Sequence, residues 1–438
     1  MEYLSLEKYP VFLYNESMKN RVYLCIDLKS FFASVECVSR GLDPMCTNLV
    51  VADPERGDKT ICLAVTPAMK ALGVRNRCRV FEIPKHISYI TASPRMKLYI
   101  DYAAKIYGIY LRYVSKEDIH VYSIDEVFMD VTGYLSLYGK TPREMAVMLM
   151  GEVLRETGIR ATCGIGTNLY LAKIALDITA KHATDFIGEL TVESYRETLW
   201  NHRPLTDFWR IGPGTARRLE SLCIYTMGDV AHTSEDLLYR HFGIDAELLI
   251  DHAWGLEPTT IADIHGYRSK TNCLTSGQVL MRDYTAEEGV LIVKEMMDLL
   301  CLEMVDRGVV TQSVTLQVGY SSAWDRAFVK GTASVSRATH SDTVWVKEIE
   351  DLYRKIVHPE AQVRRMSITC NKIEEPGSVQ YTLFEDPVEE EQHDRLQKTV
   401  VGLRKRFGKN AVVKGMNLEE HGTTIERNRQ IGGHKSGE

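Results

Sequence analysis

Two short stretches decide the fold: Val22-Tyr-Leu-Cys-Ile-Asp27 and His120-Val-Tyr-Ser-Ile-Asp-Glu-Val-Phe-Met-Asp-Val131. The first is an apolar run that ends in a carboxylate, which predicts a buried strand. The second carries the acidic pair Asp125 and Glu126 at its centre, which predicts a hairpin-like segment. Around them, strand-like and helix-like segments alternate from residue 20 to residue 185. This alternation favours a ferredoxin-like sheet with helices on one face.

The segments on either side follow from capping residues and hydrophobic spacing. Ser30 is placed to cap a helix through about residue 40, and residues 190–255 have the pattern of short helices with glycine turns. A polar linker is expected at 263–272, a second mixed α/β region at 273–372 and a flexible acidic stretch at 376–393. Further segments are expected as helices at 67–73, 95–114, 142–157, 168–181 and 287–305, and as strands at 49–52, 59–65, 160–165 and 314–320.

Length and composition limit the number of domains and the class of protein. A chain of 438 residues predicts two to four domains. With 45% apolar and 26% charged residues it is an ordinary globular chain, and no uncharged apolar run approaches the ~20 residues of a membrane span. The ten cysteines are scattered without a Cys-x-x-Cys pair, and the first ten residues lack a signal-peptide layout. We therefore expect a cytoplasmic protein with reduced thiols and no zinc site.

The charge is unevenly distributed. The net charge is −6, but residues 374–394 hold eight acids and no lysine or arginine, so the rest of the chain carries +2. Residues 326–372 have nine bases against five acids, and residues 395–438 have ten against four. A nucleic acid partner is therefore compatible with the acidic total.

Three carboxylates form the first candidate site. Asp27 ends one expected strand, and Asp125 and Glu126 interrupt a second apolar segment. Carboxylates on adjacent strands cannot all ionise close together without a cation, and hard divalent ions prefer oxygen ligands. Two such ions about 3.5–4 Å apart form a clamp for phosphoryl transfer. The alternative is that these acids lie at strand ends and face solvent.

Aromatic and basic residues supply two weaker candidates. Phe32, which follows Phe31, could exclude a sugar 2′-hydroxyl by contact, although an ordinary core pair is the simpler interpretation. Lys173, at the end of Asn168-Leu-Tyr-Leu-Ala-Lys173, and Lys70 on an earlier helix could hold a triphosphate. A solvated lysine on a helix surface is the alternative for each.

Two further stretches favour contacts with macromolecules. Arg210-Ile-Gly-Pro-Gly-Thr-Ala-Arg-Arg-Leu219 resembles a helix-hairpin-helix element, in which Gly212, Gly214 and Arg217 would grip a DNA phosphate. A plain helix–helix turn is the alternative. Gln380-Tyr-Thr-Leu-Phe384 lies in the acidic stretch with no core to join, as in peptides that dock in a hydrophobic groove. A short edge strand or a chance match is the alternative here.

Taken together and in this order, these segments resemble the Y-family of DNA polymerases, the translesion class, in its Gram-positive UmuC-like (UvrX-type) branch. The resemblance covers roughly residues 20–430. It is carried by Ile26-Asp-Leu-Lys-Ser-Phe-Phe-Ala-Ser-Val-Glu36, Tyr122-Ser-Ile-Asp-Glu-Val-Phe128, Gly164-Ile-Gly-Thr-Asn-Leu-Tyr-Leu-Ala-Lys-Ile-Ala175 and Ile425-Glu-Arg-Asn-Arg-Gln-Ile-Gly-Gly-His-Lys435.

The resemblance implies an α+β multidomain fold, a right-hand polymerase with a ferredoxin-like palm, small fingers, a helical thumb and an α/β little finger. The domains expected from it are the palm at 20–30 and 97–186, the fingers at 31–96, the thumb at 187–262, the linker at 263–272, the little finger at 273–373, the acidic segment at 374–394 and an extension of unassigned role at 395–438.

The resemblance also implies residue roles. Asp27, Asp125 and Glu126 match the catalytic carboxylates that bind two Mg²⁺ ions (with Mn²⁺ as an alternative), and Leu28 would add its backbone carbonyl. Phe32 matches the ribose gate. The expected triphosphate contacts are Phe31, Lys70 and Lys173, and the expected sliding-clamp contacts are Gln380, Leu383 and Phe384. Pro67 and Lys70 depart from the tyrosine and arginine of many relatives, which leaves the second triphosphate contact open.

The activity so implied is low-fidelity translesion synthesis, as in DNA repair after damage, the SOS response and mutator function. The implied partners are primer–template DNA, a dNTP and the replication sliding clamp, for a monomer without membrane contact. Two alternatives remain: a non-catalytic accessory relative that only binds DNA and the clamp, and a nucleotidyl cyclase with a similar sheet and carboxylates.

Overall fold

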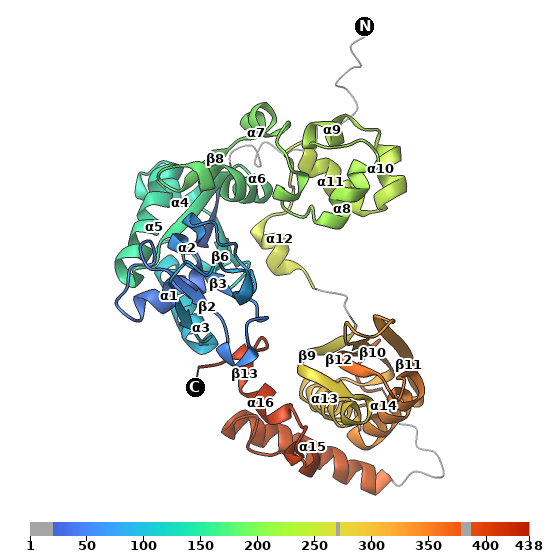
Figure 1. Ribbon diagram of the computed structural model, residues 1–438. Helices are drawn as coiled ribbons and strands as arrows, with labels where there is room; N and C mark the ends of the chain where they lie inside the picture. Colours follow the sequence, from blue (N-terminus) through green and yellow to red (C-terminus); the bar gives the residue numbers. More distant parts are fainter. Residues whose placement is uncertain (1–20, 269–271, 378–386, 438) are drawn as a thin grey trace. The chain divides into compact units, whose positions relative to one another are not determined.

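The computed structural model describes residues 21–268, 272–377 and 387–437 (Figure 1). Within them the chain divides into two compact units, residues 21–268 and residues 272–436, and each is described by itself. No helix of the described ranges is both long and apolar enough to cross a membrane. The ten cysteines all lie in these ranges, and all are free thiols.

The first unit is built on a five-stranded sheet with the order β5-β6-β1-β7-β8. The strand β1 lies between β6 and β7 and is antiparallel to both, and β6 and β5 form a hairpin. The first four strands therefore have the ferredoxin-like connection that the sequence predicts. The strands are β1 (Tyr23–Leu28), β5 (Ile119–Val121), β6 (Glu126–Asp130), β7 (Ala161–Gly166) and β8 (Ile187–Leu190).

Helices cover both faces of this sheet, so the expectation of helices on one face is wrong. Leu24 and Ile26 of β1 pack into the main core with α3 (Met96–Tyr110) and α5 (Pro142–Thr157). Tyr23 and Cys25 point the other way and pack against α6 (Leu169–Ile174). Side chains alternate along a strand, and β1 is apolar on both faces because both are covered.

The helix expected at 168–181 is present but irregular. A π-helical turn (Ala175–Thr179) and a 3₁₀ turn (Ala180–His182) follow α6. Two glycines of β7 explain how closely α6 approaches the sheet. A Cβ atom on Gly164 would lie 2.0 Å from the carbonyl oxygen of Ala172, and one on Gly166 would lie 2.2 Å from the nitrogen of Ala172. Any larger residue would displace α6.

A small three-stranded sheet, with the order β3-β2-β4, lies between β1 and α3 in the chain. It has its own small core, which includes Val50, Val65 and Met69. The fingers expectation falls on this region. Its elements are α1 (Phe31–Val38), β2 (Leu49–Val51), β3 (Ala64–Val65), α2 (Pro67–Ala71) and β4 (Ile90–Ala92).

A helical region follows β8, as the glycine-rich pattern predicts, and forms a separate core. Part of the expected linker is helical as well, because α12 (Ile261–Gly266) begins with Thr260 and Asp263 in a reciprocal capping box and buries Ile261 against the α6 face. The earlier helices are α7 (Val192–Leu199), α8 (Pro213–Glu220), α9 (Met227–His232), α10 (Glu235–Phe242) and α11 (Asp245–Ala253).

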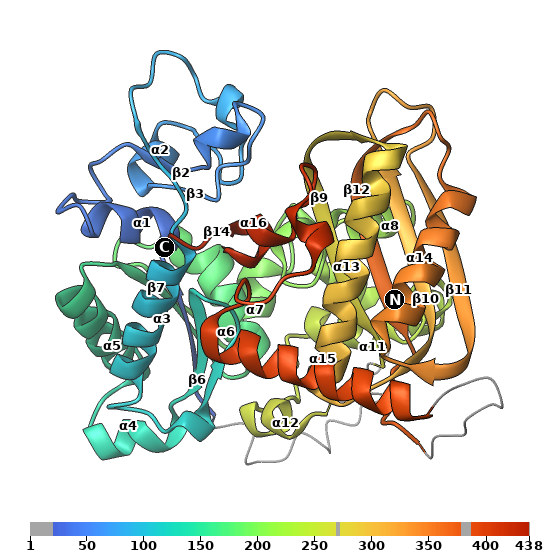
Figure 2. The ribbon, with the colours of Figure 1, turned by 90° about the horizontal axis from the view of Figure 1, so that it is seen from below.

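The second unit is an antiparallel sheet with the order β11-β10-β12-β9, and two helices pack on one face (Figure 2). Its other face is open and polar along β10 and β12. The elements are β9 (Leu274–Thr285), α13 (Ala286–Arg307), β10 (Thr311–Tyr320), β11 (Phe328–Thr339), α14 (Asp342–Ile356) and β12 (Gln362–Asn371).

The acidic stretch at 376–393 was expected to be flexible from its composition, and this expectation is wrong for its described second half, which is helical. The helix α15 (Pro387–Phe407) takes up its second half, where Glu390 pairs with Arg337 and Asp394 lies 2.9 Å from His340. Acids in the first turns of a helix also complement its dipole. The chain continues through α16 (Thr424–Asn428) to the short pair β13 (Gln430–Ile431) and β14 (His434–Lys435). The peptide Gln380–Phe384 lies outside the described residues.

Candidate active site

The register of two strands brings the three predicted carboxylates together. Asp27 of β1 is directly opposite Glu126 of β6 in the antiparallel pair. The peptide N–H of Leu28 donates to the carbonyl oxygen of Asp125 at 2.9 Å. Residues from two distant segments therefore meet at one end of the central strands, as the sequence predicts.

The charges of this group are poorly compensated. Burial, followed by the neighbouring charges of Asp125 and Glu126, raises the pKa of Asp27 to about 7, while Lys173 opposes the rise. Burial also raises the pKa of Glu126, and again Lys173 opposes it. A buried carboxylate beside two others is destabilised in its charged form, and a bound cation is the direct remedy.

Lys173 is the present partner of Glu126. Its Nζ donates to Oε2 of Glu126 at 2.7 Å and lies 3.1 Å from Oδ2 of Asp177. The thiol of Cys25 donates to the other Glu126 oxygen at 3.3 Å. Burial lowers the pKa of Lys173, but Cys25, Asp177 and Glu126 together raise it above its ordinary value. The close approach of α6 to β7, which the two glycines permit, puts this lysine within reach.

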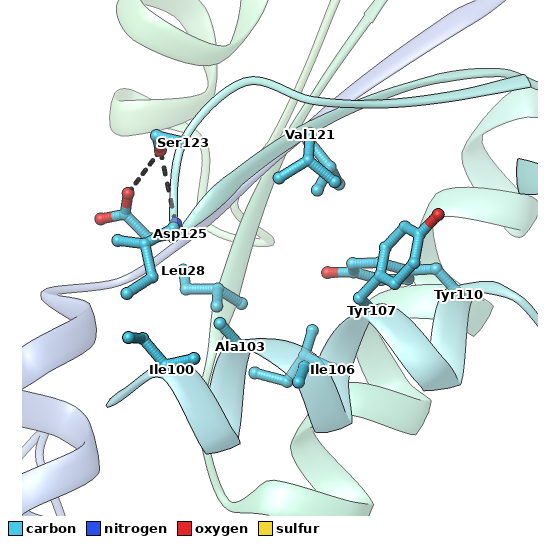
Figure 3. A pocket seen from close by; sticks show the side chains of 12 residues that line it. Leu28, Ile100, Ala103, Ile106, Tyr107, Tyr110, Val121, Ser123 and Asp125 are labelled. Atoms are coloured by element: carbon cyan, nitrogen blue, oxygen red, sulfur yellow. Dashed lines mark hydrogen bonds between the residues drawn. The ribbon is translucent and has the colours of Figure 1, made fainter. Parts of the chain in front are cut away.

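Asp125 has a different environment. Its carboxylate accepts a hydrogen bond from the Ser123 hydroxyl at 2.6 Å (Figure 3). Below it, between α3 and the β5–β6 hairpin, lies a pocket of about 350 Å³ with mostly apolar walls, including Leu28, Ile100 and Tyr107. The pocket leaves the hairpin tip accessible on the α3 side.

The N-terminus of α1 follows Asp27 closely and is uncapped. Ser30 was expected to cap it, but its backbone is left-handed (φ 49°) and its side chain makes no capping hydrogen bond. The Ser30 hydroxyl is buried and finds no partner among the described residues. The first N–H groups of a helix have no partner within the helix, and together they attract anions. Because the Phe31 ring is buried, only its backbone can take part in such binding.

Phe32 is held against a tyrosine. Its ring stacks on Tyr99, with the ring centroids 4.6 Å apart and an angle of 20° between the planes. The ring centroids of Phe32 and Phe31 are 5.7 Å apart. Tyr99 is itself fixed because its hydroxyl donates to Glu36 at 2.7 Å. Phe32 is therefore a partly buried, positioned ring immediately after the carboxylate strand.

Two lysines stand near the carboxylates. Partial burial lowers the pKa of Lys70 on α2, and the Asp27 carboxylate opposes that shift. Burial and then the charge of Lys70 lower the pKa of Lys29. Sequence reasoning passed over Lys29, although its place two residues after Asp27 was a usable signal. The partners Cys25 and Ser123 were also missed, because neither residue type stands out in an apolar strand or a turn.

The glycine hairpin of the helical region is open to solvent. Gly212 is the N-cap of α8, and Gly212, Gly214 and Arg217 are all exposed. A Cβ atom on either glycine would meet nothing within 4 Å. The hairpin is separate from the carboxylate group, and its exposed backbone suits contact with a large ligand such as a phosphodiester chain.

The carboxylates fit a pair of hard divalent cations by their chemistry. Among the described residues no three Asp, Glu, His or Cys side chains are placed to hold a metal ion, since Glu126 faces Lys173 and Asp125 faces Ser123. The donors available are nevertheless all oxygens, from Asp27, Asp125 and Glu126 with the Leu28 carbonyl, which is the set that Mg²⁺ and Mn²⁺ prefer.

A ferredoxin-like sheet with carboxylates at one strand end, a helical region and a second α/β unit form the arrangement expected of a right-hand polymerase. The model of the impB/mucB/samB family matches residues 26–177, and that of its C-terminal domain matches residues 274–383. The chain therefore belongs to this family, the Y-family DNA polymerases.

Individual proteins that are similar to this chain support the same family assignment. The chain is 32% identical over 421 residues to "Putative UV-damage repair protein UvrX" of Bacillus subtilis (strain 168), covering 94% of this chain and 97% of that protein. It is 30% identical over 426 residues to "DNA polymerase IV 2" of the same organism, covering 95% and 99%. Among solved structures it resembles a Y-family DNA polymerase chimera, Dbh-Dpo4(243-245)-Dbh, with TM-score 0.62 and 19% identity over 81% of this chain and 100% of that one. The fold is that of a Y-family polymerase.

Proposed function

We propose that the protein is a template-directed DNA polymerase that transfers a nucleotide from a dNTP to a primer 3′-hydroxyl in low-fidelity translesion synthesis. The observation that carries the proposal is the opposition of Asp27 and Glu126 across β1 and β6, with Asp125 adjoining. The similarity to proteins named as DNA polymerase IV and as a UV-damage repair protein supports it.

The carboxylates hold and orient the reacting groups. Asp27, Asp125 and Glu126, with the Leu28 carbonyl, would bind two Mg²⁺ ions (Mn²⁺ as the alternative). Such ions acidify an attacking hydroxyl and neutralise charge on a triphosphate. Asp27 is close to both of the other carboxylates, because the charges of Asp125 and Glu126 each raise its pKa. The buried walls of β1 and β6 limit the water around these carboxylates.

Cationic and backbone groups then bind the triphosphate. The uncapped N-terminus of α1 offers the N–H of Phe31, and Lys70 supplies a charge near Asp27. Lys173, whose ammonium now neutralises Glu126, becomes available to the triphosphate once Glu126 binds a cation. Phe32, fixed on Tyr99, closes the sugar side of the site as a ribose gate.

The DNA is gripped without reading its sequence. Gly212, Gly214 and Arg217 present exposed backbone and a cation, which suits phosphate contacts whose affinity falls steeply with salt. We further propose that Gln380, Leu383 and Phe384 bind the replication sliding clamp, that the protein acts as a monomer in the cytoplasm, and that it serves DNA repair, the SOS response and mutagenesis after DNA damage.

A primer-extension assay with Mg²⁺ and four deoxynucleotides tests the proposal. The purified chain should extend a primer on an undamaged template, and on a template with a lesion it should insert opposite the damage. A non-catalytic accessory relative would bind the DNA without extending it. A nucleotidyl cyclase would consume nucleoside triphosphate without any primer; this alternative has no use for the matched C-terminal domain. Absence of extension under these conditions would refute the proposal.

A further inference from the structure

A side-chain contact joins the turn that carries Asp125 and Glu126 to the helical region. The Nε1–H of Trp209 donates a hydrogen bond to the hydroxyl of Tyr122 at 3.1 Å, and the centroids of the two rings lie 5.9 Å apart. Tyr122 belongs to the tip of the β5–β6 hairpin, and Trp209 lies in the loop before α8. Both are in the first unit, whose sheet and helical region have separate cores. The contact therefore connects two parts of the unit that each have a core of their own.

Tyr122 is held in the same backbone turn as the carboxylates; we call residues 122–126 the catalytic turn. The N–H groups of Tyr122 and Ser123 both donate to the carbonyl oxygen of Glu126, at 3.0 and 3.1 Å. The Ser123 hydroxyl donates to the Asp125 carboxylate at 2.6 Å. A shift of Tyr122 is therefore passed to both carboxylates, and a displacement of about 1 Å at a reacting group can cost about 100-fold in rate.

The tyrosine ring also packs against the strand that follows the catalytic turn. Phe128 of β6 is buried, and its ring centroid lies 5.7 Å from that of Tyr122 and 6.2 Å from that of Trp209. Tyr122 itself is 46% exposed, so burial of apolar surface accounts for only part of its placement. A hydrogen bond is directional, so the Trp209 donor fixes the orientation of the phenol as well as its distance.

Trp209 is fixed to the helical region on its own side. Phe208 and Ile211, which flank it in the chain, are buried, and the N–H of Ile211 donates to the carbonyl oxygen of Phe208 at 3.1 Å. The indole lies nearly parallel to the ring of His252, with the centroids 6.0 Å apart and an angle of 20° between the planes. His252 is buried and lies 3.1 Å from Glu257. The core of the helical region therefore holds the indole.

The glycine hairpin begins directly after this turn. Arg210 has a left-handed backbone (φ 69°), and its guanidinium carbon lies 5.1 Å from the centroid of the Trp209 ring. A non-glycine residue keeps such a backbone only where its surroundings impose it. Gly212, the exposed N-cap of α8, follows. A phosphate bound at Gly212 and Gly214 would thus lie on the same short segment as the indole that holds Tyr122.

We propose that Tyr122 and Trp209 are positioning residues that couple the binding of a DNA phosphate at the glycine hairpin to the placement of the catalytic turn. The inference rests on the proposed polymerase function, which supplies the DNA and the reaction. DNA bound at the hairpin fixes the start of α8, and the hydrogen bond from Trp209 to Tyr122 then holds the catalytic turn in place. Such coupling is a free energy shared by two sites. Its loss should lower the rate of transfer in the protein–DNA complex, while the remaining phosphate contacts maintain affinity.

Two conservative variants test the contact in primer extension by the full chain. Tyr122→Phe keeps the ring and removes the hydroxyl, and kcat at saturating primer–template and dNTP should fall about 3- to 10-fold, as expected for one neutral hydrogen bond. Its affinity for primer–template should stay within about threefold of wild type. Trp209→Phe keeps an aromatic ring without the N–H and should also lower kcat. The double variant should be no slower than the slower single variant, because both changes remove one shared contact.

Tyr134→Phe is the matched control for the loss of a tyrosine hydroxyl. The Tyr134 hydroxyl donates to Asp118 at 2.7 Å and accepts from the N–H of Ser115 at 3.0 Å. These partners precede β5 and lie outside the catalytic turn, so Tyr134→Phe should keep the wild-type kcat. An equal fall of kcat in Tyr134→Phe and Tyr122→Phe would show a general effect of a lost hydroxyl and would overturn the inference.

A third variant tests the coupling itself. Arg217→Ala removes a cation beside the glycine hairpin and should lower kcat at saturating DNA in the wild-type background but not in the Tyr122→Phe background. Equal effects in the two backgrounds, or a wild-type kcat in Tyr122→Phe, overturn the inference alone. A wild-type protein that does not extend primers overturns the proposed function as well.

Discussion

Asp27 and Glu126 face each other across the antiparallel strands β1 and β6, and the Leu28 N–H that follows Asp27 donates to the carbonyl of Asp125. This register concentrates three carboxylates at the end of two strands whose other residues, except the partly buried Asp130, are buried. Burial and mutual repulsion then raise the pKa of Asp27. A charged carboxylate in such a group costs free energy unless a cation lies close, and Lys173 is the cation that meets Glu126 in the structure.

Replacing Asp27 by Asn removes one of these charges and keeps the size of the side chain. The protein free of divalent ions should become more stable by about 1–2 kcal/mol, because an uncompensated buried charge costs free energy. Thermal unfolding in EDTA and in Mg²⁺ measures this, and Mg²⁺ should raise the Tm of wild type more than that of the variant. The exposed Glu117→Gln is the control and should change neither value. A less stable Asp27→Asn protein in EDTA would contradict the like-charge argument.

The ion pair of Lys173 and Glu126 should behave as a coupled unit. Lys173→Met alone leaves Glu126 without its 2.7 Å partner in a buried site and should lower the free energy of unfolding by about 2–4 kcal/mol. The double variant Lys173→Met/Glu126→Gln should recover much of that loss. Urea unfolding of the two single variants and the double variant gives the coupling energy. Additive effects would show that the pair is not held as described.

Phe32→Ala should increase ribonucleotide incorporation by at least about 10-fold, because the ring that would contact a 2′-hydroxyl is removed. The measurement is the ratio of kcat/KM for a ribonucleotide and the matching deoxynucleotide. Tyr99→Phe is the matched control, since it keeps the stacked ring and loses only the hydroxyl bonded to Glu36. An unchanged ratio in Phe32→Ala would return that residue to a packing role.

The segment Gln380–Phe384, which we propose to bind the sliding clamp, should affect the processivity of primer extension and not the rate of nucleotidyl transfer. Leu383→Ala/Phe384→Ala should extend short primers normally but lose stimulation by a loaded sliding clamp, because apolar anchors carry such docking. The control Tyr381→Ala/Thr382→Ala changes the two unspecified positions of the Gln-x-x-Leu-Phe pattern. Product lengths with and without the clamp measure the effect. Equal stimulation of both variants would disprove docking through Leu383 and Phe384.

Acid should release the chain's end from the second unit. Asp342 is buried and accepts from His393 at 2.5 Å, from Gln397 at 3.0 Å and from Lys414. Burial raises the pKa of Asp342, but the bonds from Lys414 and His393 outweigh it and hold the pKa below its usual value. Lys414 also pairs with Asp298, whose pKa burial raises.

A carboxylate whose pKa is lower in the folded protein than in the unfolded protein stabilises the fold at any pH above its unfolded-state pKa. That contribution is lost as the pH falls through its folded-state pKa. Stability should therefore decline below about pH 4, as the Asp342 carboxylate becomes protonated. Amide exchange of α15 between pH 3 and 5 measures this. In Asp342→Asn the decline should be smaller, and an identical profile in both proteins would remove Asp342 from the explanation.

The sequence was most informative where local patterns and the burial of side chains agree. The apolar run before Asp27 predicted β1, and Pro142 and Thr157 bound the helix α5 in the structure as in the prediction. The meeting of the carboxylates followed from placing both segments in one sheet. Each of these inferences needed only the period of the side chains and the ends of the elements.

Contacts between distant residues were beyond such reasoning. The first part of the linker is helical because Ile261 packs against α6, which is distant in the sequence. The helix α15 is stabilised by ion pairs with Arg337 and His340, which lie before it in the chain. The pairing of Lys173 with Glu126 requires the close approach that Gly164 permits. Ser30 fails as a cap because its backbone turns left-handed, a property that its residue type does not reveal.

The central claim is that Asp27, Asp125 and Glu126 act together in nucleotidyl transfer. Its most direct test is Mg²⁺-dependent primer extension by wild type, Asp27→Asn, Asp125→Asn and Glu126→Gln, with primer–template affinity measured in parallel. Each variant should lose at least about 1,000-fold in kcat, as expected when the clamp for phosphoryl transfer is broken, while its affinity for DNA stays within about twofold of wild type. An Asp125→Asn protein that extends primers as fast as wild type would contradict the account.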